Sequence, residues 1–285
     1  MKTFLGIAFA VCLIFPGLGA AAEGKKPTIT VEQEKHGDRV FTMVRIAVPT
    51  IPGFECDVWC YEDALRQGEG SPQPDGSMIV RHKHPKGAEV ETRLVPSVGA
   101  VDWYVTVTGP TPEAVKAVTS VNGCWQLRRA PGFQSVKDQF VESFVNQCFI
   151  YTARGFTLLK DTERFPDTRR PATHNTNSPP WVQVYLPVWR KHPGQPAAFW
   201  GNSTDQPLYS IAGEVSRDMK YLAAWGCKRS NSIGQGWHDC LHIGPDLRLD
   251  YDEKTNRTVS HFKMYFMEND PEELLKQYKE DFSIP

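Results

Sequence analysis

Hydrophobic and polar residues alternate in short runs along most of the chain, and these runs are rich in valine, isoleucine, threonine and aromatic residues. This period of two is typical of β-strands that bury one face. Turn signals such as Pro74-Asp75-Gly76 separate the runs. The predicted strands cover residues 28–32, 39–48, 78–82, 90–95, 103–108, 149–152, 156–159, 181–189, 209–215, 221–225 and 261–267. So many short strands predict a mainly β protein, a large antiparallel β-sandwich.

Helix signals are few, and the clearest lies near residue 285. Asn269 or Asp270 can act as the N-cap, Pro271 suits the first helical position, and the helix is expected to end near Phe282. A shorter helix is expected within residues 111–118. The apolar stripe of the C-terminal helix predicts that it docks on a sheet, and it consists of Leu274, Leu275, Tyr278 and Phe282.

The first residues have the order of a signal peptide. Lys2 precedes an uninterrupted apolar run over residues 4–15, and helix-breaking and then small residues follow. This order predicts a signal peptide, residues 1–22, cleaved before Glu23, with cleavage after Ala20 as the alternative. The run is shorter than the about 20 residues that span a bilayer. We therefore expect a secreted or periplasmic protein that folds as a single β-sandwich domain over residues 23–285, without membrane insertion.

Charge argues against one class of partner. The formal net charge is −1, and loss of Lys2 with the signal peptide makes it −2. Nucleic-acid binding needs concentrated positive charge, so no nucleic-acid partner is expected. The sequence leaves the oligomeric state open.

The number of cysteines permits disulfide bonds but does not determine which cysteines pair. Six remain after the signal peptide, an even number that permits three bridges in an oxidising compartment. Cys56 and Cys60 would lie roughly 13 Å apart in one extended strand, beyond the disulfide limit of about 7 Å between Cα atoms. Cys227 and Cys240 flank a predicted hairpin loop and are candidates for a bridge across it. Free, buried cysteines are the alternative, because a chain of this length can build a core without crosslinks. The six are Cys56, Cys60, Cys124, Cys148, Cys227 and Cys240.

The densest group of reactive side chains lies within residues 237–242. If this segment is extended, His238, Cys240 and His242 project to one face. We take His238 and His242 as the candidate catalytic residues, since imidazoles can donate and accept protons near neutral pH. Two alternatives stay open: histidines that only hydrogen-bond locally, and a zinc site that includes Cys240. The spacing matches no structural-zinc signature, so neither a metal nor a cofactor is predicted.

Four further residues are candidates for substrate binding. In the segment 124–128, Trp125 alternates with polar neighbours, so the opposite face can form the floor of a polar groove. Arg128 can bind a carboxylate through two hydrogen bonds, as a uronic acid offers. Trp200 and Trp237 lie beside glycine in predicted loops, where an indole can stack on a sugar ring. The histidines within residues 81–84 are interpreted as part of a solvated hairpin end.

The second half of the chain resembles a known group of proteins. The resemblance rests on Cys-Trp-Gln-Leu-Arg (124–128), Cys-Phe-Ile-Tyr-Thr (148–152), Pro-Pro-Trp-Val-Gln (179–183), residues 235–245 (QGWHDCLHIGP) and residues 267–271. These segments are similar to uncharacterised exported β-sandwich proteins of environmental bacteria. That group is distantly similar to the galactose-mutarotase-like fold, which sugar epimerases and domains of polysaccharide-degrading enzymes share. The acid and base of mutarotases match no residue here, so the resemblance implies a fold and no catalytic assignment.

These observations together predict a secreted or periplasmic carbohydrate-binding protein, with action on sugars or polysaccharide fragments by histidine acid/base chemistry as its catalytic form. The alternative is a non-catalytic extracellular or envelope protein that interacts with other proteins. A single face that carries the candidate residues together favours the first.

Overall fold

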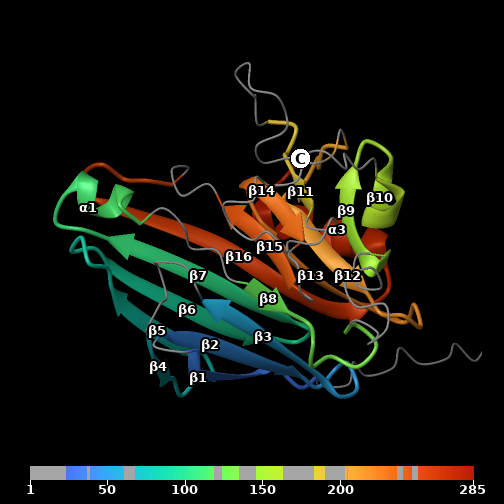
Figure 1. Ribbon diagram of the computed structural model, residues 1–285, viewed down its shortest axis with the longest axis horizontal. Coiled ribbons are helices and arrows are strands. Elements are labelled where there is room, and N and C mark those ends of the chain that lie inside the picture. The colour runs from blue at the N-terminus through green and yellow to red at the C-terminus, as the bar shows by residue number, and fades with distance from the viewer. Residues whose placement is uncertain are drawn as a thin grey trace, which may run out of the picture.

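The computed structural model describes residues 24–36, 39–60, 68–118, 124–134, 146–162, 183–189, 203, 205–235, 240–245 and 250–285. In these residues the chain is mainly β, with two antiparallel sheets (Figure 1). The seven-stranded sheet has the order β1 (Thr28–His36), β2 (Arg39–Val48), β3 (Phe54–Cys60), β8 (Cys124–Gln126), β15 (Cys240–Pro245), β14 (Ser230–Gln235) and β11 (Gln183–Tyr185). The nine-stranded sheet has the order β10 (Gly155–Leu158), β9 (Cys148–Thr152), β12 (Ile211–Val215), β13 (Tyr221–Cys227), β16 (Arg257–Glu268), β7 (Ala100–Thr108), β6 (Glu89–Ser97), β5 (Met78–Lys83) and β4 (Glu69–Pro72).

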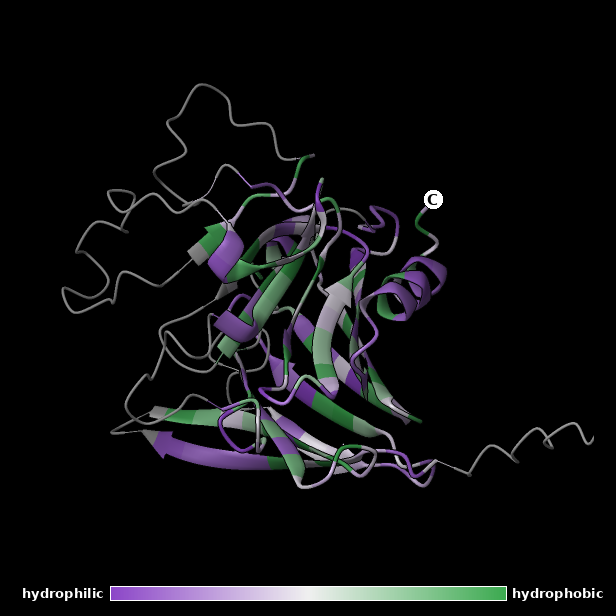
Figure 2. Cartoon of the chain, turned by 90° about the vertical axis from the view of Figure 1, so that its right-hand side faces the viewer, coloured by the Kyte–Doolittle hydropathy of each residue, from purple (hydrophilic) through white to green (hydrophobic). Residues whose placement is uncertain are grey.

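The two sheets bury one core between them, as expected of a β-sandwich. Trp125 comes from the seven-stranded sheet, whereas Trp103 and Trp225 come from the nine-stranded one. The rings of Trp103 and Trp225 are stacked with centroids 5.8 Å apart, and Trp125 meets Trp225 edge-on at 5.9 Å. Buried and more exposed residues alternate along β6 and β7, whereas β9 and β12 are buried at every position. Figure 2 shows the hydrophobic and hydrophilic residues along the strands.

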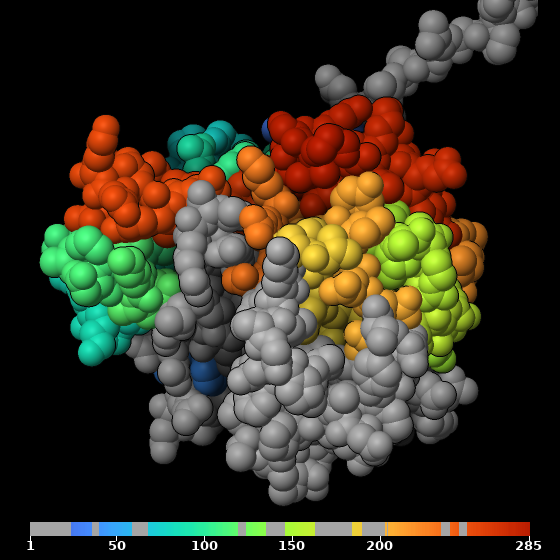
Figure 3. All heavy atoms as spheres, turned by 90° about the horizontal axis from the view of Figure 1, so that it is seen from above, coloured from blue at the N-terminus to red at the C-terminus, as the bar shows by residue number. Residues whose placement is uncertain are grey.

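Helix α3 (Pro271–Phe282) forms a third layer on the nine-stranded sheet. It begins as predicted: the Asp270 carboxylate accepts a hydrogen bond from the Glu273 amide, and Pro271 occupies the first turn. Figure 3 shows the helix, in red, beside the surface formed by β9, β10 and the segment before β12. The predicted docking stripe is confirmed, because Leu274, Tyr278 and Phe282 are buried against apolar residues of β9, β12, β13 and β16.

A polar network fixes this helix to the sheet. The Tyr278 hydroxyl accepts a hydrogen bond from the Ser210 amide and donates one to the Cys227 carbonyl, at 3.0 and 2.9 Å. On β16, Nζ of Lys263 lies 2.8 Å from the Asp281 carboxylate of α3. The nearby His261 binds Asp102, so this histidine–aspartate pair belongs to the helix-docking network.

Most predicted strands are present, but β3, β4, β8, β14 and β15 lie outside the predicted ranges. Within the described residues, only 183–185 of the predicted strand 181–189 are extended, as β11. Residues 54–60 form β3, which the strand prediction omits. β4 is a short, exposed edge strand. Ser230-Asn231-Ser232 lies in β14, where pairing with β11 and β15 holds a polar sequence extended. The short helix α1 (Pro112–Lys116) matches its prediction.

The cysteines correct one expectation. The five whose side chains are described are buried and form no disulfide bond with one another, so the proposed bridge between Cys227 and Cys240 is wrong. Cys227 ends β13 in the nine-stranded sheet, whereas Cys240 begins β15 in the other sheet. Cys56 lies in an extended strand, as the argument against its pairing with Cys60 requires.

The predictions on the signal peptide, the domain and membrane insertion are tested only in part. Residues 1–23 lie outside the described residues, so the signal peptide stays a prediction, as does the single domain over residues 23–285. No helix within the described ranges combines the length and the hydropathy needed to cross a bilayer.

Candidate functional site

The seven-stranded sheet has one apolar and one polar face. Val58, Trp125 and Leu241 are paired in register and point into the core between the sheets. The residues next to them therefore point to the opposite side. We call that side the polar face, and its members on the central strands are Arg45, Asp57, Cys124, Gln126, Cys240 and His242.

Three arginines converge on one carboxylate of the polar face. Asp57 is fully buried, and its two oxygens accept hydrogen bonds from Nε of Arg45 at 3.0 Å and Nε of Arg129 at 2.9 Å. Nη2 of Arg128 lies 3.9 Å from the same carboxylate, and Arg45 also binds Glu32 at 2.9 Å. We call Arg45, Arg128, Arg129 and Asp57 the guanidinium cluster. The side chains of Arg128 and Arg129 are 43% and 46% exposed, so a buried anion holds two cations at the protein surface.

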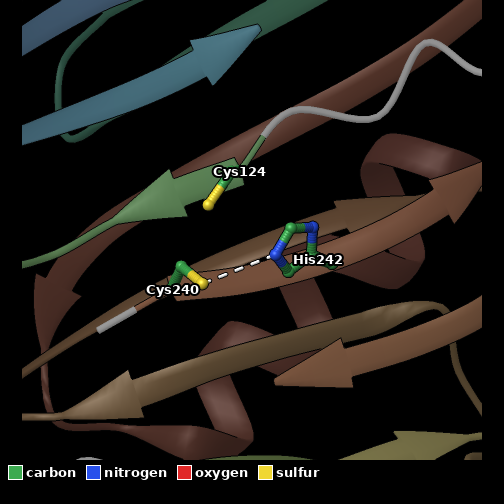
Figure 4. A group of neighbouring side chains, drawn as sticks. All are labelled: Cys124, Cys240 and His242. Atoms are coloured by element: carbon green, nitrogen blue, oxygen red, sulfur yellow. Dashed lines mark hydrogen bonds between the residues drawn. The ribbon is translucent and has the colours of Figure 1, made fainter. Parts of the chain in front are cut away.

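A second group lies on the same face and consists of Cys124, Cys240 and His242, which we call the thiol–imidazole cluster. Cys240 and His242 are two positions apart on β15, and Sγ of Cys240 lies 3.5 Å from Nε2 of His242. Figure 4 shows Cys124 pointing from β8 toward this pair. The two sulfur atoms and one histidine nitrogen all lie within 4.8 Å of one another.

The cluster changes the acidity of its first cysteine. A hydrogen bond with Cys240 and the neighbouring His242 hold the pKa of the Cys124 thiol well below its ordinary value, although burial opposes this. Cys56, on the apolar face of the same sheet, shows the reverse: burial strongly raises its pKa. Two cysteines of one sheet therefore differ because one faces polar partners and the other faces the core.

Gln126 connects the two clusters. In the sheet register it lies between Asp57 on β3 and Cys240 on β15. Its Nε2 donates a hydrogen bond to Sγ of Cys124 at 3.4 Å, and its side chain is buried. Because adjacent strands are about 4.8 Å apart, Asp57 and Cys240 lie about 10 Å apart across this strand.

The structure places three of the predicted site residues. Arg128 and His242 lie on the same polar face, as the carbohydrate hypothesis requires. Trp125 does not: it is fully buried in the core, on the opposite face, so its assignment to ligand binding is wrong. The alternation that places Trp125 and Leu127 in the core and Gln126 on the polar face is confirmed. The remaining predicted site residues, His238, Trp200 and Trp237, lie outside the described residues.

Cys124, Asp57 and Arg129 were not among the predicted site residues. The alternation that puts Gln126 on the polar face also puts Cys124 there, so a signal for Cys124 was present. Asp57 and Arg129 are brought together by the pairing of β3 with β8, which no local pattern encodes.

A cavity of about 440 Å³ lies elsewhere, on the outer side of the nine-stranded sheet. It is lined in part by Arg81, Lys83, Glu89, Glu91 and Arg257. Arg81 and Glu91 form an ion pair of 2.8 Å with both side chains well exposed. Arg81 and Lys83 are exposed, as the interpretation of a solvated hairpin end requires, whereas His84 is buried, which corrects that interpretation for this histidine. We prefer the polar face because its cations are anchored by a buried anion.

Comparisons with known proteins give little guidance. No protein-family model matches the chain, and no curated protein matches it. Among solved structures, the chain is similar to a protein from Escherichia coli K12 described as a putative aldose 1-epimerase. That match covers 84% of this chain and 99% of the other, with 10% identity and a TM-score of 0.35. This is a distant likeness, so function has to be argued from the residues of this chain.

Proposed function

We propose that this chain is an exported protein that binds acidic carbohydrate, with the polar face of the seven-stranded sheet as its binding surface. One observation carries the proposal: two exposed guanidinium groups, of Arg128 and Arg129, are held side by side by the buried Asp57. Planar guanidinium groups bind carboxylates through paired, charge-assisted hydrogen bonds. Because the arginines are already positioned, less side-chain entropy is lost on binding.

The charge of the guanidinium cluster fits a monovalent anion. Three arginines face Asp57, and Glu32 offsets part of the charge on Arg45. These five side chains carry one formal positive charge, and the exposed Arg128 and Arg129 present it at the surface. Such a local patch suits one sugar carboxylate better than a polyanion such as nucleic acid, whose binding needs many cations.

The rest of the face offers groups that hydroxyls can use. Thr30 lies beside Arg45 in the register of β1 and β2, and Glu55 is an exposed residue of β3 on the same side. Hydroxyl and carboxylate oxygens accept hydrogen bonds from sugar hydroxyls. A uronic-acid oligosaccharide combines both demands, a carboxylate for the arginines and hydroxyls for their neighbours.

We propose binding in preference to histidine-based catalysis. The predicted acid/base residue His242 has its Nε2 atom 3.5 Å from the Cys240 thiol, so this nitrogen is engaged within the thiol–imidazole cluster. A general acid or base has to reach the proton that it transfers, within about 3 Å or through one water.

The proposal is tested by titrating the protein with a uronate trisaccharide and with its neutral methyl ester, by calorimetry. We expect binding of the acid and at least about tenfold weaker binding of the ester, equal to about 1.4 kcal/mol. The Arg129→Ala variant should lose the preference for the acid. Arg154→Ala, which changes an exposed, ion-paired arginine in the turn between β9 and β10, should keep it. Equal affinity of the wild-type protein for the acid and the ester contradicts the proposal. An equal preference for the acid in Arg129→Ala and Arg154→Ala contradicts it as well. No binding across acidic and neutral sugars favours the interaction-protein alternative.

A further inference from the structure

The thiol–imidazole cluster has the composition of a metal site. Cys124 and His242 are opposite each other when the register of β8 and β15 is extended by one residue, and Cys240 lies diagonally across. All three side chains therefore leave the same side of two adjacent strands. Figure 4 shows the three groups turned toward a common centre.

The separations agree with tetrahedral coordination. Zinc–sulfur and zinc–nitrogen bonds of about 2.3 and 2.0–2.1 Å, at a tetrahedral angle, place sulfur and nitrogen about 3.6 Å apart and two sulfurs about 3.8 Å apart. Sγ of Cys240 and Nε2 of His242 are 3.5 Å apart, and the third ligand atom lies within 4.8 Å of both. A small movement of Cys124 is enough to complete three corners of a tetrahedron.

The surroundings suit a bound cation as well. Gln126 donates a hydrogen bond to Sγ of Cys124, which is how outer groups orient and stabilise a thiolate ligand. Met43 belongs to the same buried cluster as the two cysteines, which are themselves buried from water. Two thiolates and one divalent cation sum to zero charge, which keeps the desolvation cost of a buried site small.

We infer that Cys124, Cys240 and His242 form a zinc(II) site. Among the residues that the structure describes, these three supply the ligands, and the fourth tetrahedral position is left for a further ligand or a water molecule. This site differs from the zinc alternative in the sequence analysis, because Cys124 of another strand takes the place of His238. The inference does not depend on carbohydrate binding, which concerns the guanidinium cluster.

The test uses the protein expressed without residues 1–22 and freed of metal by a chelator under reducing conditions. Zinc is titrated against a chromophoric competitor, and cobalt(II) is added to a parallel sample to reveal thiolate-to-metal charge-transfer absorption. We expect one zinc per chain and the cobalt signature of a tetrahedral thiolate site. Gln126→Ala should weaken zinc binding by roughly 10- to 100-fold, the usual cost of losing an outer hydrogen bond, and removal of a direct ligand should cost more.

Variants locate the site. Cys124→Ala, Cys240→Ala and His242→Ala should each abolish the tight binding, whereas Cys56→Ala, a buried cysteine on the other face of the sheet, should leave it intact. Circular dichroism of each variant separates loss of a ligand from loss of the fold. No stoichiometric zinc in the wild-type protein, equal loss in Cys56→Ala, or a Cys124–Cys240 disulfide found by mass spectrometry of the non-reduced protein would overturn the inference. Selective binding of copper(I) over zinc would overturn the assignment of the metal.

The outcome is separable from that of the proposed function. Arg129→Ala changes the guanidinium cluster and should leave zinc affinity unchanged. If the wild-type protein binds uronate but not zinc, the zinc site is misassigned. If it binds zinc but not uronate, the uronate site is misassigned.

Discussion

Sγ of Cys240 and Nε2 of His242 lie 3.5 Å apart, two residues along one strand, on the side of the sheet that turns away from the core. Strand alternation alone explains why the pair shares a face. Cys124 joins them from β8, whose own polar side continues through Gln126 to the arginines around Asp57. Thiols, an imidazole and guanidinium groups thus share one sheet face, and this concentration of reactive groups is the basis of the proposals above.

Asp57 should be essential for stability as well as for arginine placement. Asp57→Asn removes the buried carboxylate that accepts hydrogen bonds from Arg45 and Arg129. Hydrogen bonds to charged groups contribute about 1.5–3 kcal/mol each, so the free energy of unfolding should fall by about 2–4 kcal/mol. Chemical denaturation measures the change. The matched control is Glu91→Gln, which breaks the exposed pair with Arg81 and should cost no more than about 1 kcal/mol. Equal effects of the two substitutions contradict the burial argument.

Trp125 should matter for the core and not for the ligand. Trp125→Phe removes part of a fully buried ring that contacts Trp225 and Phe266, so the free energy of unfolding should fall by about 1–3 kcal/mol. The affinity of the folded protein for uronate should stay within about twofold, a change of about 0.4 kcal/mol. An affinity loss of about tenfold at unchanged stability would restore the original assignment of Trp125 to the binding site.

The hydroxyl of Tyr278 should contribute measurably to helix docking. Tyr278→Phe leaves the Ser210 amide and the Cys227 carbonyl without this partner, at a cost of about 1–3 kcal/mol for buried groups. The control, Tyr251→Phe, loses a hydrogen bond to Asn256 at a partly exposed position and should change stability by about 0.5 kcal/mol or less. Thermal unfolding measures the stability loss of both variants. A loss in Tyr278→Phe that is no larger than the loss in Tyr251→Phe contradicts the docking network.

Alkaline pH should destabilise the protein through Cys227. Burial raises the pKa of this thiol to about 12, whereas an unfolded cysteine has a pKa of about 8.5. Between these values the unfolded state binds fewer protons than the native state, so the free energy of unfolding falls by up to about 1.4 kcal/mol per pH unit from this group. Cys227→Ala removes this contribution, and its unfolding free energy should fall less steeply above pH 8.5 than that of the wild type. Parallel pH profiles of the two proteins would contradict the assignment.

Much of the fold follows from local sequence. The alternation in β2, β6, β7 and β16, together with the capping residues of α3, was sufficient to predict their type and approximate limits. The predicted class, a large antiparallel β-sandwich with a C-terminal helix, is confirmed. β14 was missed because its sequence, SNSIGQ, has no apolar alternation, and its conformation depends on pairing with β11 and β15.

The site was less predictable than the fold. Alternation placed Gln126 and Arg128 opposite Trp125, but assigning Trp125 to the ligand ignored that the largest apolar side chain of the segment belongs in the core. The approach of Cys124 to His242, and of Arg129 to Asp57, depends on strand order and register. Strand order is set by the packing of the whole chain, so spacing along the sequence could not reveal it.

The most direct test of the central claim is amide hydrogen exchange of the protein with and without a saturating uronate trisaccharide. We expect added protection in residues 54–60 and 124–130, which carry Asp57 and the two exposed arginines, and we expect none in Arg129→Ala. Protection confined to residues 78–83 and 89–97 would place the ligand in the cavity of the other sheet, and that result would contradict the polar face as the binding surface.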